Sequence, residues 1–61
     1  MEPPTACEVV ARLEQSGFVY VGCRGDHRKY RKDGRTVIVS GKLGEHLPQG
    51  TWLSVKRQAG W

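Results

Sequence analysis

Cysteine is scarce in this sequence, and its spacing does not support a cysteine-based metal site. The chain of 61 residues contains only Cys7 and Cys23, which lie sixteen positions apart and form no Cys-x-x-Cys motif. A zinc framework built from paired cysteines is therefore not supported, and we expect no bound metal. We expect both residues to be free, buried thiols in a reducing compartment, in preference to a disulfide.

Long apolar runs, linkers and internal repeats are also missing. No stretch has the length and hydrophobicity of a membrane span, and no secretory signal is evident. We therefore expect a cytoplasmic protein without a membrane partner, and a single domain over residues 1–61. A domain of this size buries only about 60% of the surface that its unfolded chain exposes. We accordingly expect no enclosed pocket and no small-molecule cofactor.

Acidic residues are few relative to basic ones. Six Asp and Glu stand against ten Lys and Arg, which gives a net charge of +4 and an isoelectric point near 9.5. The cations crowd between Arg24 and Lys42. This surplus favours a polyanionic partner such as nucleic acid, although an acidic protein would also suit it.

Two patterns predict helices toward the ends of the chain. Thr5 and Glu8 have the spacing of a capping box, and the apolar residues that follow recur at steps of three and four. Gly17 then predicts the end of this helix. Farther along, Thr51 can cap a second helix over Trp52–Ala59, which is short and must be held by tertiary packing.

Between these helices the apolar period changes to two, which is typical of strands. We predict strands over residues 18–23, 28–32 and 35–40, the last two joined by a two-residue turn at Asp33-Gly34. The order of helix, three antiparallel strands and helix predicts a two-layer α+β domain. Both helices are expected on one face of the sheet.

The Asp33-Gly34 turn also predicts which side chains share a face of the sheet. The core side should hold Tyr30, Val37 and Val39. Arg28 and Lys32 should lie on the same side, because they are two residues from Tyr30 along the strand. The opposite, open face should hold Lys29, Arg31, Thr36 and Ile38, together with His27.

The facing of the first strand depends on the turn that follows it. A turn spanning residues 24–27 places Val19 and Val21 on the core side and Tyr20 on the open face, which we favour because it gives a continuous apolar face. A three-residue turn would reverse this arrangement.

Candidate chemistry is concentrated in the stretch Gly25-Asp26-His27-Arg28-Lys29-Tyr30. An imidazole has an ordinary pKa of about 6.5 and can accept or donate a proton near neutrality. Any chemistry of this chain is therefore expected to pass through His27 or, less favourably, His46. The predicted phosphate contacts are the cations near His27, namely Arg24, Arg28, Lys29, Arg31 and Lys32.

Several short motifs occur together in an order that is informative. They are Ser16-Gly17-Phe18, Gly25-x-His27-x-x-Tyr30-Arg31, Asp33-Gly34-Arg35, Val37, Val39, Gly50-Thr51 and Gln58-Ala59-Gly60. Each is weak alone, but their order and spacing resemble the HicA family of small bacterial toxins. These are the mRNA interferases of HicBA toxin–antitoxin systems, and the resemblance covers nearly the whole chain.

The resemblance implies a double-stranded-RNA-binding-like α-β-β-β-α fold. It also implies a type II toxin that cleaves mRNA without metal and is neutralised by a HicB-type antitoxin. The family's functional histidine corresponds to His27, which would be the general base that helps a 2′-hydroxyl attack the adjacent phosphorus. Asp26 departs from the family's usual serine, and Arg28 stands where a second histidine often follows. Asp26 could orient His27, or it could repel phosphate.

The same features also suit a non-catalytic RNA-binding module that uses the basic face for phosphate contact alone. In that case His27 is a polar turn residue, and Tyr20 on the open face is a candidate ring for base stacking. A protein-binding adaptor is a third alternative. Substitution of His27 separates the catalytic hypothesis from the binding hypothesis.

Overall fold

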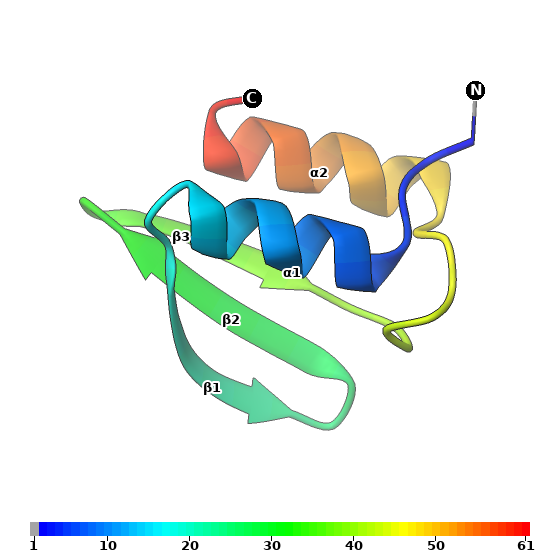
Figure 1. Ribbon diagram of the computed structural model, residues 1–61, viewed down its shortest axis with the longest axis horizontal. Helices are drawn as coiled ribbons and strands as arrows, with labels where there is room; N and C mark the ends of the chain where they lie inside the picture. The colour runs from blue at the N-terminus through cyan, green and yellow to red at the C-terminus, as the bar shows by residue number, and fades with distance from the viewer. Residues whose placement is uncertain (1) are drawn as a thin grey trace.

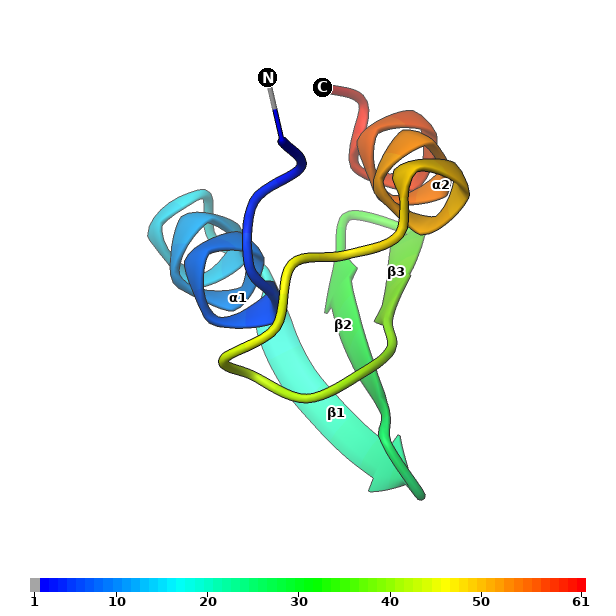
Figure 2. The ribbon, with the colours of Figure 1, turned by 90° about the vertical axis from the view of Figure 1, so that its right-hand side faces the viewer.

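The computed structural model describes residues 2–61. Its elements are, in chain order, α1 (Ala6–Gln15), β1 (Val19–Arg24), β2 (His27–Lys32), β3 (Arg35–Val39) and α2 (Gln49–Ala59) (Figure 1). The strands form one antiparallel sheet in the order β1-β2-β3. Both helices lie on one face of the sheet and leave the other face open (Figure 2). The predicted α-β-β-β-α architecture is confirmed.

Helix α1 begins at the predicted capping box. The Thr5 hydroxyl accepts a hydrogen bond from the Glu8 backbone N–H at 3.1 Å, and the Glu8 carboxylate accepts one from the Thr5 N–H at 2.8 Å. The Glu8 carboxylate accepts hydrogen bonds from both the Thr5 N–H and the Thr5 hydroxyl, and these lower the pKa of Glu8 because they favour its charged form. At the other end of the helix, the Phe18 N–H donates to the Leu13 carbonyl at 2.9 Å, which folds the chain back toward the core.

Helix α2 begins earlier than its sequence pattern predicts. It starts at Gln49 after Pro48 and spans eleven residues, so the predicted cap at Thr51 is wrong. The Pro48 φ of −57° suits a helix start, and its carbonyl accepts from the Trp52 N–H at 2.9 Å. Gly60 closes the helix with a φ of 78°, a left-handed conformation that glycine adopts easily.

The core lies between the two helices and the sheet. Leu13, Val37 and Val55 are fully buried and represent the contributions of α1, β3 and α2. Tyr30 of β2 is also buried, and this burial raises the pKa of its phenol. Among residues 2–61 the buried apolar residues are Ala6, Val9, Leu13, Phe18, Tyr30, Val37, Val39, Leu47, Val55 and Ala59.

The facing of β1 corrects the prediction from the sequence. The turn at Gly25-Asp26 is the predicted two-residue turn, with Arg24 opposite His27. A β-bulge farther along shifts the register, because Gly22 pairs with Lys29 while Tyr20 pairs with Tyr30 and the residue between them has no partner.

This bulge exchanges the expected positions of the apolar side chains of β1. Val19 and Val21 are 63% and 51% exposed, so their predicted place in the core is wrong. Tyr20 faces the core side, where its ring centroid lies 5.6 Å from that of Tyr30. Its predicted position on the open face is therefore also wrong. One unpaired residue is sufficient to reverse the facing of the residues before it, since neighbouring residues of a strand point to opposite faces.

The outer edge of β3 is covered by α2. The Ile38 backbone N–H points away from β2 and donates to the Gln58 side-chain oxygen at 3.0 Å. Arg35 reaches the Gln58 backbone carbonyl at 3.4 Å. These contacts occupy an edge that would otherwise be free to pair with another strand.

Two further expectations concern the cysteines and the membrane. Cys7 and Cys23 are free, as expected, but both are exposed, so the predicted burial of the thiols is wrong. The Cys23 thiol donates to the Gly25 carbonyl at 3.0 Å. Neither helix within residues 2–61 has the length and hydrophobicity needed to cross a membrane.

Candidate functional site

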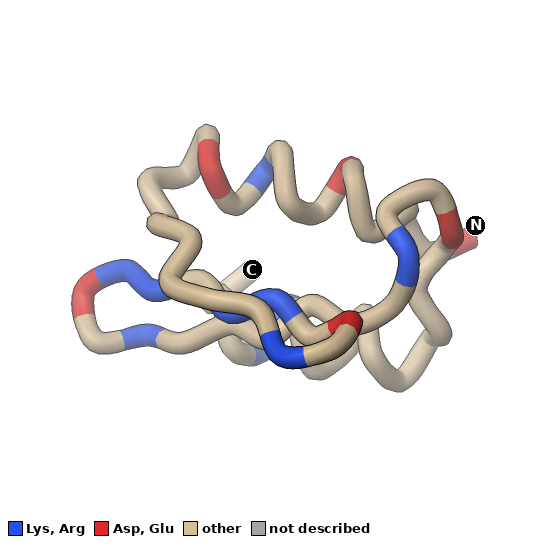
Figure 3. The backbone as a smooth tube through the Cα atoms, turned by 90° about the horizontal axis from the view of Figure 1, so that it is seen from below, with Lys and Arg blue, Asp and Glu red and all other residues tan. Residues whose placement is uncertain are grey.

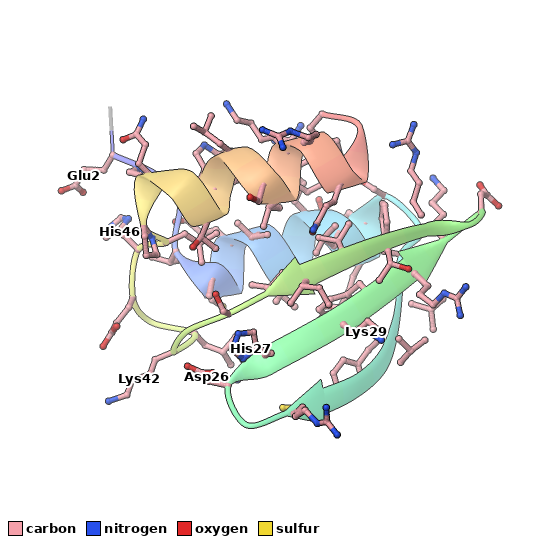
Figure 4. All side chains as sticks on the ribbon, turned by 180° about the vertical axis from the view of Figure 1, so that it is seen from behind. Glu2, Asp26, His27, Lys29, Lys42 and His46 are labelled. Carbon is pink, nitrogen blue, oxygen red and sulfur yellow. The ribbon has the colours of Figure 1, made fainter. Side chains whose placement is uncertain are left out.

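His27 and Asp26 form a contact pair where the β1–β2 turn meets the sheet (Figure 4). Gly25 permits this turn with a φ of 62°, and the His27 Nδ1 lies 3.0 Å from the Asp26 Oδ1. The negative Asp26 carboxylate beside Nδ1 favours a proton on that nitrogen, and in the neutral ring this places the lone pair on Nε2. The two side chains are 60% and 64% exposed. The pair can therefore present a proton acceptor to a ligand on the surface.

A hollow of about 450 Å³ lies beside His27 on the open face of the sheet. Register explains its composition, because Lys29 is opposite Ile38 and Arg24 is opposite His27. The bulge adds Val21, which the sequence pattern assigned to the core. The lining residues are Val21, Gly22, Cys23, Arg24, His27, Lys29 and Ile38. Apolar side chains, two cations and the histidine thus surround one shallow site.

The five predicted phosphate-binding residues do not share one face. Lys29 and Arg31 occupy the open face with His27, and Arg24 is paired with His27. Arg28 is half-buried on the core side and donates to the Gly41 carbonyl at 3.1 Å. Lys32 also lies on the core side, where it donates to the Ser16 carbonyl and covers the Phe18 ring. Arg24 and Lys29 thus line one hollow with His27, and Arg31 lies farther along the same face, whereas Arg28 and Lys32 hold the layers together.

The cations of the sheet are not neutralised by neighbouring carboxylates. In the described part of the chain no Lys or Arg forms an ion pair with Asp or Glu, and both ion-pair contacts involve a histidine. Between Val19 and Val39 the only acidic residues are Asp26 and Asp33, which lie in the two turns that join the strands. Figure 3 shows the cations of the sheet as blue segments along the strands. The open face therefore has a positive potential that attracts anions.

The second histidine has a different environment. The His46 Nδ1 contacts the Pro3 carbonyl, and its Nε2 lies 3.4 Å from a Glu2 carboxylate oxygen (Figure 4). Beside it, the Leu47 N–H donates to the Pro4 carbonyl at 3.0 Å. His46 therefore fastens the loop before α2 to the start of the chain.

A hollow larger than the one beside His27 is remote from this chemistry. It measures about 700 Å³ and lies between the start of the chain and the two helices, with Trp52 and Leu53 in its wall. We place the candidate site at the smaller hollow because His27 and the cations of the open face are there. Across residues 2–61, no three His, Cys, Asp or Glu side chains gather as a metal site would require.

The fold and the site define a small, basic α+β protein with an exposed histidine on a cationic sheet face. The family model described as the HicA toxin of bacterial toxin–antitoxin systems matches residues 6–61. The chain belongs to the HicA toxin family, as its motifs predicted. It is therefore a toxin of a toxin–antitoxin system, and this membership implies an antitoxin partner. Among curated proteins, no significant match to the chain was found.

Sequence reasoning identified the polar part of the site and missed part of its apolar lining. His27, Lys29 and Ile38 were placed on the open face by the Asp33-Gly34 turn, and the structure agrees. Val21 was assigned to the core, because nothing in the local pattern distinguishes a bulged strand from a regular one. Its place in the hollow follows from the pairing of β1 with β2 alone.

Proposed function

We propose that this toxin is an endoribonuclease that cleaves mRNA with His27 as its general base. The observation that supports this most directly is the Asp26 carboxylate 3.0 Å from the His27 Nδ1, because negative charge at that nitrogen favours the neutral tautomer whose lone pair is on Nε2. That nitrogen belongs to a residue lining a hollow with two cations. A phosphodiester bound there would meet a base and positive charge together.

The proposed reaction begins at the ribose 2′-hydroxyl next to the phosphate. His27 Nε2 takes the hydroxyl proton while the oxygen bonds to phosphorus, and the bond from phosphorus to the 5′-oxygen breaks. The leaving oxygen takes a proton from water, and the imidazolium later returns its proton to solvent. The products are a 2′,3′-cyclic phosphate and a 5′-hydroxyl. These steps need no metal ion, because Lys29 and Arg24, which line the same hollow as His27, can stabilise the developing charge.

We also propose a HicB-type antitoxin as the partner and the cytoplasm as the site of action. The open face is basic and exposed, so a partner with an acidic surface could cover His27 and exclude RNA. Removal of a general base costs about 10²–10⁴-fold in rate. Covering His27 alone would therefore be sufficient to silence the toxin.

The test compares wild-type protein with His27→Ala and with His46→Ala, which removes the other imidazole. Each is expressed in cells while growth and RNA integrity are followed, and each is incubated with labelled RNA in the presence of EDTA. We expect cleavage and growth arrest from the wild type and from a folded His46→Ala, and neither from His27→Ala. The products should carry cyclic phosphate ends, and 2′-deoxy substitution at the cleavage site should block the reaction.

Two results would oppose this proposal. If His27→Ala cleaves as fast as the wild type, His27 is not the base. If none of the proteins cleaves RNA but all bind it with equal affinity, the chain is a non-catalytic RNA-binding module.

A further inference from the structure

The hollow beside His27 contains apolar surface that phosphate contact alone does not use. Val21 is 51% exposed and lies in the hollow with Ile38, beside the cations Arg24 and Lys29. Binding is favoured when a ligand covers exposed apolar surface, because that surface is then removed from water. Val21 reaches this position because of the bulge, which moves it out of register with β2.

We propose that Val21 and Ile38 form the floor of a subsite that holds one unpaired nucleobase of single-stranded RNA. The inference rests on the proposed ribonuclease function and adds the substrate class to it. A nucleotide joins a flat, largely apolar base face to an anionic phosphate. The hollow has matching parts, with Val21 and Ile38 for the base and Lys29 and Arg24 for the phosphate. Its volume of about 450 Å³ suits a small ligand.

The base must be unpaired for a physical reason. In an A-form helix the bases are stacked, and the deep, narrow major groove keeps side chains from their edges. A base can reach the floor of the hollow only when it has left the stack. His27 lines the same hollow, so the released base belongs to a nucleotide next to the phosphate under attack. Unstacking also frees the backbone to adopt the in-line geometry that the attack requires.

The floor is aliphatic because the aromatic rings of the sheet face the other way. Tyr20 and Tyr30 pack against each other on the core side. Base recognition on this sheet therefore depends on contact with Val21 and Ile38 in place of ring stacking. Apolar contact does not distinguish the hydrogen-bond donors and acceptors of the four bases. It therefore selects for an unpaired base more strongly than for a particular base.

The test measures binding with a probe that cannot be cleaved. A short, fluorescein-labelled 2′-O-methyl oligonucleotide has no free 2′-hydroxyl, and its affinity is measured by fluorescence anisotropy. We expect Val21→Thr, which loses one methyl group, and Ile38→Val, which is shorter by one carbon, each to weaken binding of the single strand about fourfold. Val19→Thr is the matched control, because Val19 is exposed on the same strand but lies outside the hollow. Its affinity should equal that of the wild type.

Two further probes separate the base from the phosphates. An oligomer of equal length and charge built from abasic units should bind the wild type more weakly than the normal probe, and should bind Val21→Thr and wild type equally. The same 2′-O-methyl sequence in a duplex should also show no difference between these proteins. Equal binding of the single strand by Val21→Thr and Val19→Thr would overturn the base subsite.

Failure of the subsite and failure of the ribonuclease give different results. If Val21→Thr binds the single strand normally while cleavage still requires His27, the base subsite is overturned and the ribonuclease remains. If the wild type never cleaves RNA but its single-strand binding depends on Val21, the subsite is supported and the ribonuclease is overturned.

Discussion

Replacement of Asp26 by Asn decides whether this carboxylate assists His27 or only repels the substrate. Asn has nearly the same size but carries no charge, so it removes both the electrostatic support of the imidazole and the repulsion of phosphate. The two effects act on different kinetic constants. Support of a ring that becomes cationic during proton transfer appears in kcat, whereas repulsion of a polyanion appears mainly in KM.

The exposure of the pair sets the size of the effect. The side chains of His27 and Asp26 are 60% and 64% exposed, so their contact is worth about 0.2–1 kcal/mol, as for other exposed pairs. If all of this is gained when the ring becomes cationic, kcat falls by about 1.4–5-fold in Asp26→Asn. A buried Asp–His pair can cost about 10⁴-fold, and exposure to water excludes a loss of that size here. KM should fall or stay the same.

The assay is the initial rate of cleavage of a labelled RNA over a range of substrate concentrations. Asp33→Asn is the matched control, because it makes the same charge change at the other hairpin turn. Asp33 has a φ of 49°, a conformation that Asn tolerates, so the control should fold normally. We expect Asp33→Asn to lower KM slightly and leave kcat unchanged. An unchanged or higher kcat in Asp26→Asn, relative to this control, would refute the orienting role.

Three further predictions test the face assignments and the fold. Lys29→Ala should reduce the slope of log affinity against log salt by about 0.7 for single-stranded RNA. Lys32→Ala should leave this slope unchanged, because Lys32 contacts the Ser16 carbonyl. Fluorescence anisotropy titrations at several salt concentrations measure the slope for each variant. Because the folded-state pKa of Glu8 is lowered, its contribution to stability is present above the usual value of 4.5 and is lost as pH falls through the folded pKa. The difference in Tm between wild type and Glu8→Gln, followed by circular dichroism, should therefore shrink on acidification. Leu13→Ala should cost about 2–5 kcal/mol of roughly 3–9 kcal/mol in total, which urea unfolding measures.

The parts of the fold that the sequence predicts well depend on local signals. The capping box of Thr5 and Glu8 needs only three residues of separation, and the Asp33-Gly34 turn fixes the pairing of β2 with β3 through backbone conformation. That turn also places His27 on the open face. The charged part of the candidate site could thus be predicted from one dipeptide and the alternation of a strand.

The register of β1 depends on packing that no local signal reports. Either Tyr20 or Val21 can face Tyr30, and both are residues with high strand propensity. The structure has the bulge, in which Tyr20 packs against Tyr30 and Val21 has no partner. The start of α2 has a similar origin. Thr51 is a better cap by residue type, but Pro48 begins the helix about one turn earlier, and its carbonyl accepts a hydrogen bond from the Trp52 N–H.

The residues of the site whose facing the sequence predicts lie on a different strand from the residue whose facing it does not predict. His27 and Lys29 belong to β2, whose facing is fixed by hairpin turns at both ends. Val21 belongs to β1, an edge strand whose facing changes with a single inserted residue. The proton acceptor and the phosphate contact of Lys29 are therefore held on the central strand of the sheet. Arg24 and the proposed base contact of Val21 lie on the edge strand, whose register changes most easily. It follows that a one-residue change in the length of β1 would alter the apolar floor while the catalytic pair remained in place.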